Sequence, residues 1–279
     1  MNYRTILYES QGAIAFITLN RPEVRNAQNE ELKDELDLAL KNAEADEGIR
    51  VIVLRGAGSC FSSGHDMKQF PRDPDSFQAS DRRKWFEGDT AKVRKFVYKI
   101  LRYFLNLHYL TKPTIAQVHG YCIAGGWVLA SMCDIIIASE DAEFIDPVLR
   151  MGSTGVEAIV EPWDVGYRKA KELMWTGEGI TAKEAWEFGM VNKVVARDEL
   201  EKETMLMAQK IATTPPGTLQ ATKRSINRAL DLMGWRQSHE QHVDVWLSNH
   251  LGDEHKTLHK DRQDLDLKDF IHKRDAGYE

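Results

Sequence analysis

Residues 113–138 read Pro113-Thr-Ile-Ala-Gln-Val-His-Gly-Tyr-Cys-Ile-Ala-Gly-Gly-Trp-Val-Leu-Ala-Ser-Met-Cys-Asp-Ile-Ile-Ile-Ala138. The pattern predicts a strand over 114–118, a glycine-bearing loop, a short helix over 125–132 and a second strand over 134–138. Short, mostly apolar strands of this kind are typical of a parallel sheet buried on both faces. The stretch therefore favours an α/β fold with helices covering a mostly parallel sheet.

The same alternation continues on both sides of this stretch. Residues 12–19 predict a strand that stops before Pro22, residues 29–45 a helix, residues 50–55 a buried strand, and residues 79–110 a further helix. After about residue 198 the strand signals stop and the chain is helical and charged. We therefore predict a core domain over residues 1–198 and a helical region over 199–279. The large apolar residues of this region are expected to pack on the main domain or on another subunit; they are Trp235, Trp246, Leu247 and Leu251.

Composition excludes several classes of function. The 279 residues include 37 Lys and Arg against 43 Asp and Glu, a formal net charge of −6, so general attraction to nucleic acid or to anionic lipid is not expected. Cys60, Cys122 and Cys133 form no C-x-x-C pair, which argues against a disulfide framework or a zinc site and fits a reducing, cytoplasmic setting. No apolar run approaches the roughly 20 residues of a membrane span, and no targeting segment is expected.

Two glycine-bearing loops each follow a predicted strand, over residues 56–66 and 119–126. Neither fits a phosphate-binding loop or a dinucleotide-binding pattern. Glycines at strand ends that open into helices leave backbone N–H groups free, and two such loops brought together form a site for a developing oxyanion. The alternative is that both loops are ordinary tight turns.

Three strings carry a resemblance to a known family: Phe61-Ser-Ser-Gly-His-Asp-Met67, residues 113–130, and Met132-Cys-Asp-Ile-Ile-Ile-Ala138. They resemble the crotonase (enoyl-CoA hydratase/isomerase) superfamily, and the match runs from residues 20–27 through 175–177 and 189–194 to 223–228, over nearly the whole chain. The resemblance implies an α/β fold that is a crotonase-type spiral of β-β-α units, followed by a C-terminal helical trimerisation region. A homotrimer or a dimer of trimers is expected.

The resemblance also implies an acyl-CoA substrate whose thioester oxygen accepts hydrogen bonds from the backbone N–H groups of His65 and Gly125. Fixed dipoles at this oxygen favour an enolate. No metal or redox cofactor is expected, since coenzyme A enters as part of the substrate, and the His65 side chain is expected to pack or line the pocket. Coenzyme A and substrate contacts are expected at Arg25, Ser63, Gly64, Asp66, Trp127, Phe270 and Lys273, the last two from a neighbouring subunit. The alternatives are a structural cap for Asp66, a core position for Trp127 and an ordinary basic tail at the C-terminus.

The chain departs from the family at two positions. Hydratases of the superfamily use two glutamates as general acid and base, and the matching positions here are Val128 and Val148. Valine neither takes nor gives a proton, so the usual syn addition of water loses its proton-transfer groups.

Other carboxylates are candidates for proton transfer: Glu157, Glu161 and Asp146. An apolar pocket would raise the pKa of Glu157 into a useful range. The alternative is structural, because Thr154-Gly-Val-Glu157 has the spacing of a helix capping box. Glu161 would share a face with Glu157 if a helix continued between them.

The sequence thus predicts an acyl-CoA enzyme with isomerase, hydrolase or nonstandard hydratase chemistry through an enolate. The alternative is a catalytically inactive acyl-CoA-binding or RNA-associated crotonase-like protein. His255 and His259 have an i, i+4 spacing that suits a metal, but their charged surroundings favour a solvated helix face.

Overall fold

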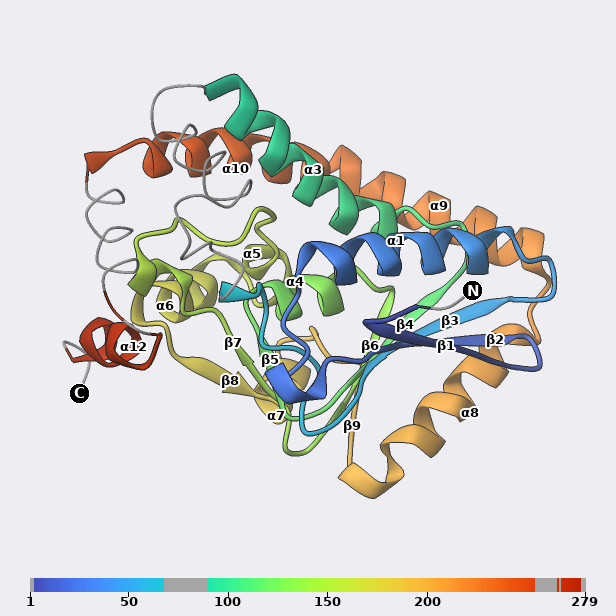
Figure 1. Ribbon diagram of the computed structural model, residues 1–279. Helices are drawn as coiled ribbons and strands as arrows, with labels where there is room; N and C mark the ends of the chain where they lie inside the picture. Colours follow the sequence, from blue (N-terminus) through green and yellow to red (C-terminus); the bar gives the residue numbers. More distant parts are fainter. Residues whose placement is uncertain (1–2, 68–89, 254–264, 266, 277–279) are drawn as a thin grey trace.

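A six-stranded sheet lies at the centre of the molecule (Figure 1). The computed structural model describes residues 3–67, 90–253, 265 and 267–276. The strand order is β1-β2-β3-β4-β6-β9, and every neighbouring pair is parallel except β1 with β2. The predicted parallel α/β sheet is thereby confirmed. The strands are β1 (Ile6–Gln11), β2 (Ile14–Leu19), β3 (Val51–Gly56), β4 (Thr114–Val118), β6 (Ile135–Ser139) and β9 (Lys193–Val195).

A second, three-stranded sheet holds the segments next to the glycine-bearing loops. It consists of β5 (Tyr121–Ile123), β7 (Glu143–Ile145) and β8 (Gly179–Thr181), with β5 parallel to β7 and β7 antiparallel to β8. Strands of three residues leave almost no periodic signal, so sequence patterning does not find them. Turns of the chain through both sheets give the spiral that the family resemblance implies.

Helices cover both faces of the large sheet (Figure 1). On one side lie α1 (Glu30–Ala45), α3 (Thr90–His108), α9 (Pro216–Leu232) and α10 (Trp235–His250), and on the other lies α8 (Leu200–Ala212). The remaining helices are α4 (Gly125–Ser131), α5 (Glu161–Asp164), α6 (Tyr167–Thr176), α7 (Ala182–Glu187) and α12 (Leu267–Asp275), with short 3-10 turns η1 (Pro22–Val24), η3 (Val148–Met151) and η4 (Arg197–Glu199). None of the described helices has the length and apolarity needed to cross a membrane.

Helix α1 shows how local sequence produces the fold. Asn29 caps it, because its side-chain oxygen accepts a hydrogen bond from Leu32 N at 2.8 Å. Leu32, Leu36 and Leu40 follow at intervals of four, so they lie on one face of the helix, and all three are buried in the main core. The predicted helix over 29–45 is therefore correct to within one residue.

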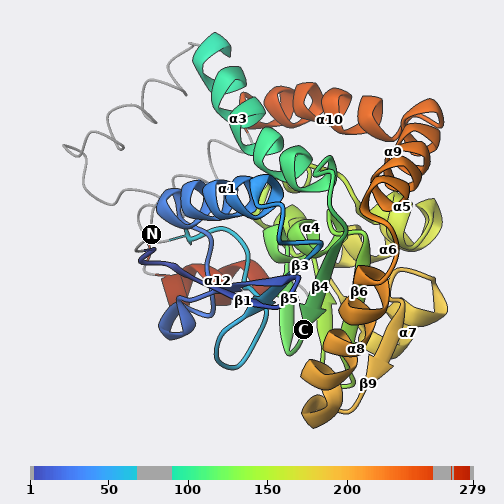
Figure 2. The ribbon, with the colours of Figure 1, turned by 90° about the vertical axis from the view of Figure 1, so that its right-hand side faces the viewer.

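The C-terminal helices are continuous with the core. Residues Leu200 and Ala208 of α8 pack against β-strand residues on one face of the sheet. Trp235 and Leu247 of α10 join the core on the other face, and the Trp235 ring stacks on His108 of α3 at 4.0 Å between ring centroids. Figure 2 shows α10 beside α3 and α9. Helix α10 is thus fixed to the same core that carries the glycine-bearing loops.

Helix α4, which begins at Gly125, is anchored by a partly buried carboxyl group. Asp164 Oδ2 accepts hydrogen bonds from Trp127 Nε1 at 2.7 Å and from Ser131 Oγ at 2.5 Å. Burial raises the pKa of Asp164 to about 6, although the two donors oppose this shift. The anchor therefore combines two good hydrogen bonds with a group that resists ionisation.

Replacing Asp164 by Asn is expected to remove part of the pH dependence of stability. A raised pKa in the folded chain means that stability is highest near or below the unfolded value of 3.8 and falls as pH rises toward about 6. Asn cannot ionise, and its amide oxygen can still accept from Trp127 and Ser131. The free energy of unfolding of Asp164→Asn relative to wild type should rise by up to about 3 kcal/mol between roughly pH 4 and pH 6.5. Urea denaturation at both pH values measures this, and a pH-independent difference would contradict the assignment.

Candidate active site

The two glycine-bearing loops lie side by side because main-chain hydrogen bonds pair them. Ser62 forms a parallel bridge with Cys122 of β5. Ser62 N donates to Tyr121 O at 3.2 Å, and Ile123 N donates to Ser62 O at 2.9 Å. The loop over residues 61–66 thus follows β5 to its end, which brings His65 next to the start of α4.

Gly64 and Gly125 meet at this point. Gly64 has a φ of +82°, and a Cβ on it would lie 2.6 Å from Ile123 O and 3.2 Å from Gly125 N. Both the backbone conformation and the space therefore require glycine. The N–H groups of His65 and Gly125 have no hydrogen-bond acceptor among the described residues, which the predicted oxyanion site requires. Their role as oxyanion donors stays a prediction.

Two side chains that sequence reasoning did not single out hold the loops together. Asn26 Nδ2 donates to the carbonyl oxygens of Ala57, Cys60 and Phe61. Gln28 Nε2 donates to Gly125 O at 2.9 Å and to Ser62 Oγ at 3.3 Å. Asn26 belongs to residues 20–27, a segment of the family match, so the sequence did mark its neighbourhood. Gln28 lies just outside that segment, and its role is recognised only from the fold.

A histidine–glutamate pair lies beside the two glycine-bearing loops. His65 Nε2 is 2.7 Å from Glu157 Oε2, and the imidazole stacks on Phe104 with 6.4 Å between ring centroids. The His65 ring covers Gly125, since a Cβ there would lie 2.9 Å from His65 Nδ1. That nitrogen is buried and has no partner among the described residues. The packing role expected for the His65 side chain is therefore accompanied by a direct bond to a candidate catalytic carboxylate.

The prediction that an apolar pocket raises the pKa of Glu157 is wrong. Burial alone would raise the pKa of Glu157, but the charge and hydrogen bond of His65, with Lys33 further off, lower it to about 2. Glu157 is therefore ionised throughout the physiological range. Its contribution to stability is present above its unfolded pKa of 4.5 and is lost as pH falls toward 2.

The capping-box interpretation of Glu157 is also wrong. Residues 152–160 form an irregular loop between η3 and α5, so no helix begins after Thr154, whose hydroxyl is buried without a partner among the described residues. The helix that would have placed Glu161 on the face of Glu157 does not exist. Pro162 stands at the start of α5, where proline is tolerated, instead of kinking a longer helix.

Glu161 lies with Asp146 instead. Both are almost fully buried, and Asp146 Oδ2 and both carboxyl oxygens of Glu161 have no donor beside them among the described residues. Burial raises the pKa of Glu161 well above its ordinary value, and the neighbouring Asp146 raises it further. Burial also raises the pKa of Asp146, whose Oδ1 accepts from Val148 N at 3.1 Å. The two carboxyl groups therefore take up a proton more readily than isolated ones, and a proton shared between them would satisfy their buried oxygens.

Val128 and Val148 are buried apolar side chains in α4 and η3. Neither can exchange a proton. The carboxyl groups that the sequence offers in their place are Asp146, Glu157 and Glu161. The structure brings Glu157 to His65 and Glu161 to Asp146, as two separate pairs.

The residues expected to contact coenzyme A lie in different surroundings. Arg25 is exposed in a left-handed conformation, and its carbonyl accepts from Ser63 N at 2.9 Å. Asp66 Oδ2 forms an ion pair with Arg21 Nη1 at 2.8 Å. Whether Asp66 contacts the substrate or acts as a structural cap stays a prediction. Trp127 is fully buried and donates to Asp164 Oδ2, as a core residue does, and its contact with an acyl group stays a prediction.

Helix α12 carries the other two residues of that set. It packs on η3 of the same chain, where Arg150 Nη1 lies 3.4 Å from Asp275 Oδ1. Phe270 is buried and Lys273 is exposed. The predicted contact with a neighbouring subunit stays a prediction.

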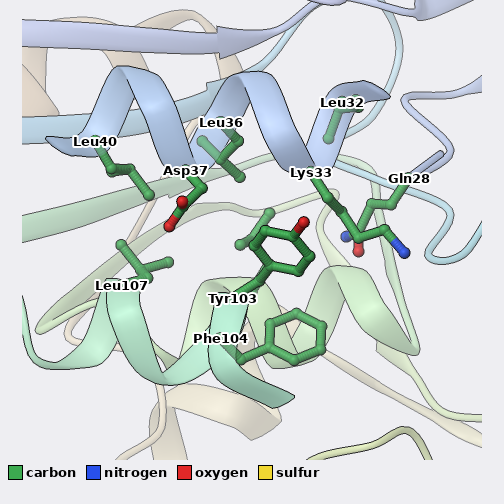
Figure 3. A pocket seen from close by; sticks show the side chains of 10 residues that line it. Gln28, Leu32, Lys33, Leu36, Asp37, Leu40, Tyr103, Phe104 and Leu107 are labelled. Carbon is green, nitrogen blue, oxygen red and sulfur yellow. The ribbon is translucent and has the colours of Figure 1, made fainter. Parts of the chain in front are cut away.

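An apolar pocket between α1 and α3 adjoins the site (Figure 3). Leu36, Leu40 and Leu107 line one end of the pocket, and Gln28 and Phe104 lie at the other. Gln28 binds Gly125 O, and the Phe104 ring stacks on His65, so this end adjoins the glycine-bearing loops. Its volume is about 20 Å³, which is room for about one water molecule. In this form the pocket is too small for an acyl chain.

Metal-type clusters of three or more His, Cys, Asp or Glu residues do not occur within the described ranges. His255 and His259 lie outside the described residues.

Comparison with known proteins agrees with this geometry. The sequence pattern of the family described as Enoyl-CoA hydratase/isomerase matches residues 9–279. EchA13 of Mycobacterium tuberculosis, which carries an enoyl-CoA hydratase name, is 41% identical over 243 residues, covering 84% of this chain and 76% of that protein. The Short-chain-enoyl-CoA hydratase of Clostridium acetobutylicum is 33% identical over 235 residues, covering 82% of this chain and 84% of the relative.

A solved structure extends the similarity to the whole chain. The crystal structure of an enoyl-CoA hydratase/isomerase from Xanthobacter autotrophicus Py2 has a TM-score of 0.88 at 36% identity, covering 100% of both chains. Together with the fold and the paired glycine loops, these matches establish that the chain belongs to the enoyl-CoA hydratase/isomerase family and has the crotonase fold.

Proposed function

We propose that the protein forms an enolate from an acyl-CoA thioester and moves a proton between its carbon atoms, using the His65–Glu157 pair. The observation that carries the proposal is the 2.7 Å contact between His65 Nε2 and Glu157 Oε2 beside Gly125. Double-bond isomerisation of an enoyl-CoA is the reaction that one proton-transfer pair can complete. The thioester bond stays intact and no water enters, because the proton removed from one carbon returns to another.

The backbone supplies the electrostatic part of this reaction. The N–H groups of His65 and Gly125 would donate to the thioester oxygen, where negative charge gathers as the carbon loses its proton. Donors that are already in place stabilise this charge without reorganising water, and loss of one donor in comparable sites costs roughly 3 kcal/mol. Gly64 and Gln28 support the arrangement, since the first allows the close approach of the loops and the second binds the Gly125 carbonyl.

The proton would pass through His65. Glu157 is ionised and would accept from His65 Nε2–H. A His65 ring with its one proton on Nε2 would present Nδ1 as the acceptor nitrogen. This nitrogen lies against Gly125. A carboxylate bound to the far nitrogen fixes the tautomer and stabilises the imidazolium that forms on proton uptake, as in other His–carboxylate pairs. Glu161 and Asp146 remain the second pair able to take part.

Hydration is the second candidate, because the relatives described above carry hydratase names. In that case the same pair would activate a water molecule, and the valines at positions 128 and 148 would make the chemistry nonstandard. A hydrolase would need water at the thioester carbon instead.

Isomerisation is expected to exceed hydration. With 3-enoyl-CoA substrates the conjugated thioester should appear at a rate in the usual enzyme range, about 1 to 1,000 per second. Crotonyl-CoA hydration should be at least about 100-fold slower, because Val128 and Val148 replace the general acid and base. Ultraviolet absorbance of the conjugated thioester follows both reactions. Crotonyl-CoA hydration at the faster rate would overturn the isomerase assignment in favour of a hydratase.

Glu157→Gln is expected to lower turnover about 100- to 10,000-fold, because glutamine keeps the shape but cannot stabilise an imidazolium. His65→Gln, which keeps the backbone N–H, should lose activity to a similar degree. Glu184→Gln is the matched control, since Glu184 is a surface residue that caps α7 through Thr181. Full activity in Glu157→Gln beside an inactive Glu161→Gln or Asp146→Asn would move the chemistry to the other carboxyl pair.

Assembly as a homotrimer or a dimer of trimers is expected, and it is measured by light scattering at micromolar concentration. Several large apolar side chains are exposed in the single chain, among them Trp175, Trp186, Leu232 and Met233, and such groups favour burial in an interface. A monomer would contradict this expectation.

A further inference from the structure

The loop that carries Glu157 is held by two histidines of α10, a helix that belongs to the C-terminal region. His242 Nε2 lies 2.9 Å from Val156 O, and Ile159 N donates to His239 Nδ1 at 3.1 Å. The two bonds therefore fix the backbone one residue before and two residues after Glu157. Residues 152–160 have no helix or strand of their own, so contacts of this kind determine where the loop lies.

The spacing and the protonation state of the two histidines suit this contact. They are three positions apart and so lie on one face of α10, and the backbone groups they bind are also three residues apart. His239 and His242 are buried, and burial lowers the pKa of both, that of His239 to about 3, so both are neutral. A neutral imidazole donates at one nitrogen and accepts at the other, which allows one residue type to bind a carbonyl and an N–H.

Packing on both sides keeps the histidines in place. Trp235, one turn before His239, contacts its ring edge at 4.2 Å between centroids and stacks on His108 of α3. On the loop side, a Cβ at Gly155 would lie 3.2 Å from His242 Nε2. Val156, Glu157 and Ala158 are buried against this face, so a displaced histidine leaves buried backbone groups without partners.

We infer that His239 and His242 are positioning residues, which set the Glu157 carboxylate at hydrogen-bond distance from His65. The inference rests on the proposed role of the His65–Glu157 pair. Neither histidine contacts the oxyanion donors, so both act through the loop. Misplacement of a catalytic group by about 1 Å costs on the order of 100-fold in rate, so a loop that shifts on release from α10 is expected to lower the rate.

Substitutions at the two positions separate hydrogen bonding from packing. His242→Leu and His239→Leu remove the bonds. His242→Gln places an amide N–H near the position of Nε2, and His239→Asn places a carbonyl oxygen near that of Nδ1. We expect the leucine variants to lose about 10- to 100-fold in kcat with KM changed less than about threefold. The amide variants should recover most of kcat. His108→Phe is the control, because it keeps the aromatic stack on Trp235 and leaves the loop bonds untouched.

A double-mutant cycle with Glu157→Gln tests whether the histidines act through Glu157. In that background His242→Leu should cause almost no further loss, because the group it positions is already disabled. Amide hydrogen exchange gives a reading that does not depend on activity. The Ile159 amide should exchange faster in His239→Leu and stay protected in His239→Asn, and this comparison holds even if a leucine variant is too unstable to assay.

The outcomes separate the two claims. Full turnover in Glu157→Gln would overturn the proposed function. Wild-type kcat in the leucine variants beside an inactive Glu157→Gln would overturn the positioning role alone. Additive losses of turnover in the double-mutant cycle would likewise overturn the positioning role, since they would show an effect of α10 that does not depend on Glu157. Equal losses of kcat in the leucine and amide variants would also overturn it, since they would show an effect that does not depend on the hydrogen bond.

Discussion

The parallel main-chain pairing of the 61–66 loop with β5 is the interaction on which the site depends. It brings the His65 and Gly125 N–H groups to one place, although 60 residues of chain separate them. Gly64 makes the approach possible, and Asn26 and Gln28 bind the loops on both sides. A site built from backbone donors is insensitive to most side-chain changes. This explains how the paired loops can persist in a chain that has valines at 128 and 148.

Sequence alone predicted what depends on local periodicity and on short motifs. The helix over 29–45 and the strand over 114–118 match α1 and β4 within a residue, because capping and apolar spacing determine them. The irregular loop over 152–160 was not predictable in the same way. A capping-box spacing suggested a helix there, but the backbone instead finds its partners on α10. Long-range contacts of this kind leave no trace in the local pattern.

The carboxyl groups show the same limit. An apolar neighbourhood predicted a raised pKa for Glu157, and burial does act in that direction. His65 reverses the sign, and its position relative to Glu157 depends on chain turns 92 residues apart. The raised pKa occurs at Glu161 and Asp164 instead, where burial is the largest cause and no cation in the described part of the chain opposes it. Which carboxyl is ionised is therefore a property of the fold and not of residue type.

The contact between Gly155 and His242 links two positions that are far apart in the chain. A methyl group at residue 155 would lie 3.2 Å from His242 Nε2 and 3.3 Å from Met174 Cε, in a backbone conformation with φ of +136°. A side chain at residue 155 is therefore disfavoured while His242 and this backbone conformation are kept. Relatives that carry a side chain at position 155 should have a smaller residue at position 242 and a different conformation of the loop over residues 152–160. Such paired replacement would mark where in the family this arrangement of α10 arose.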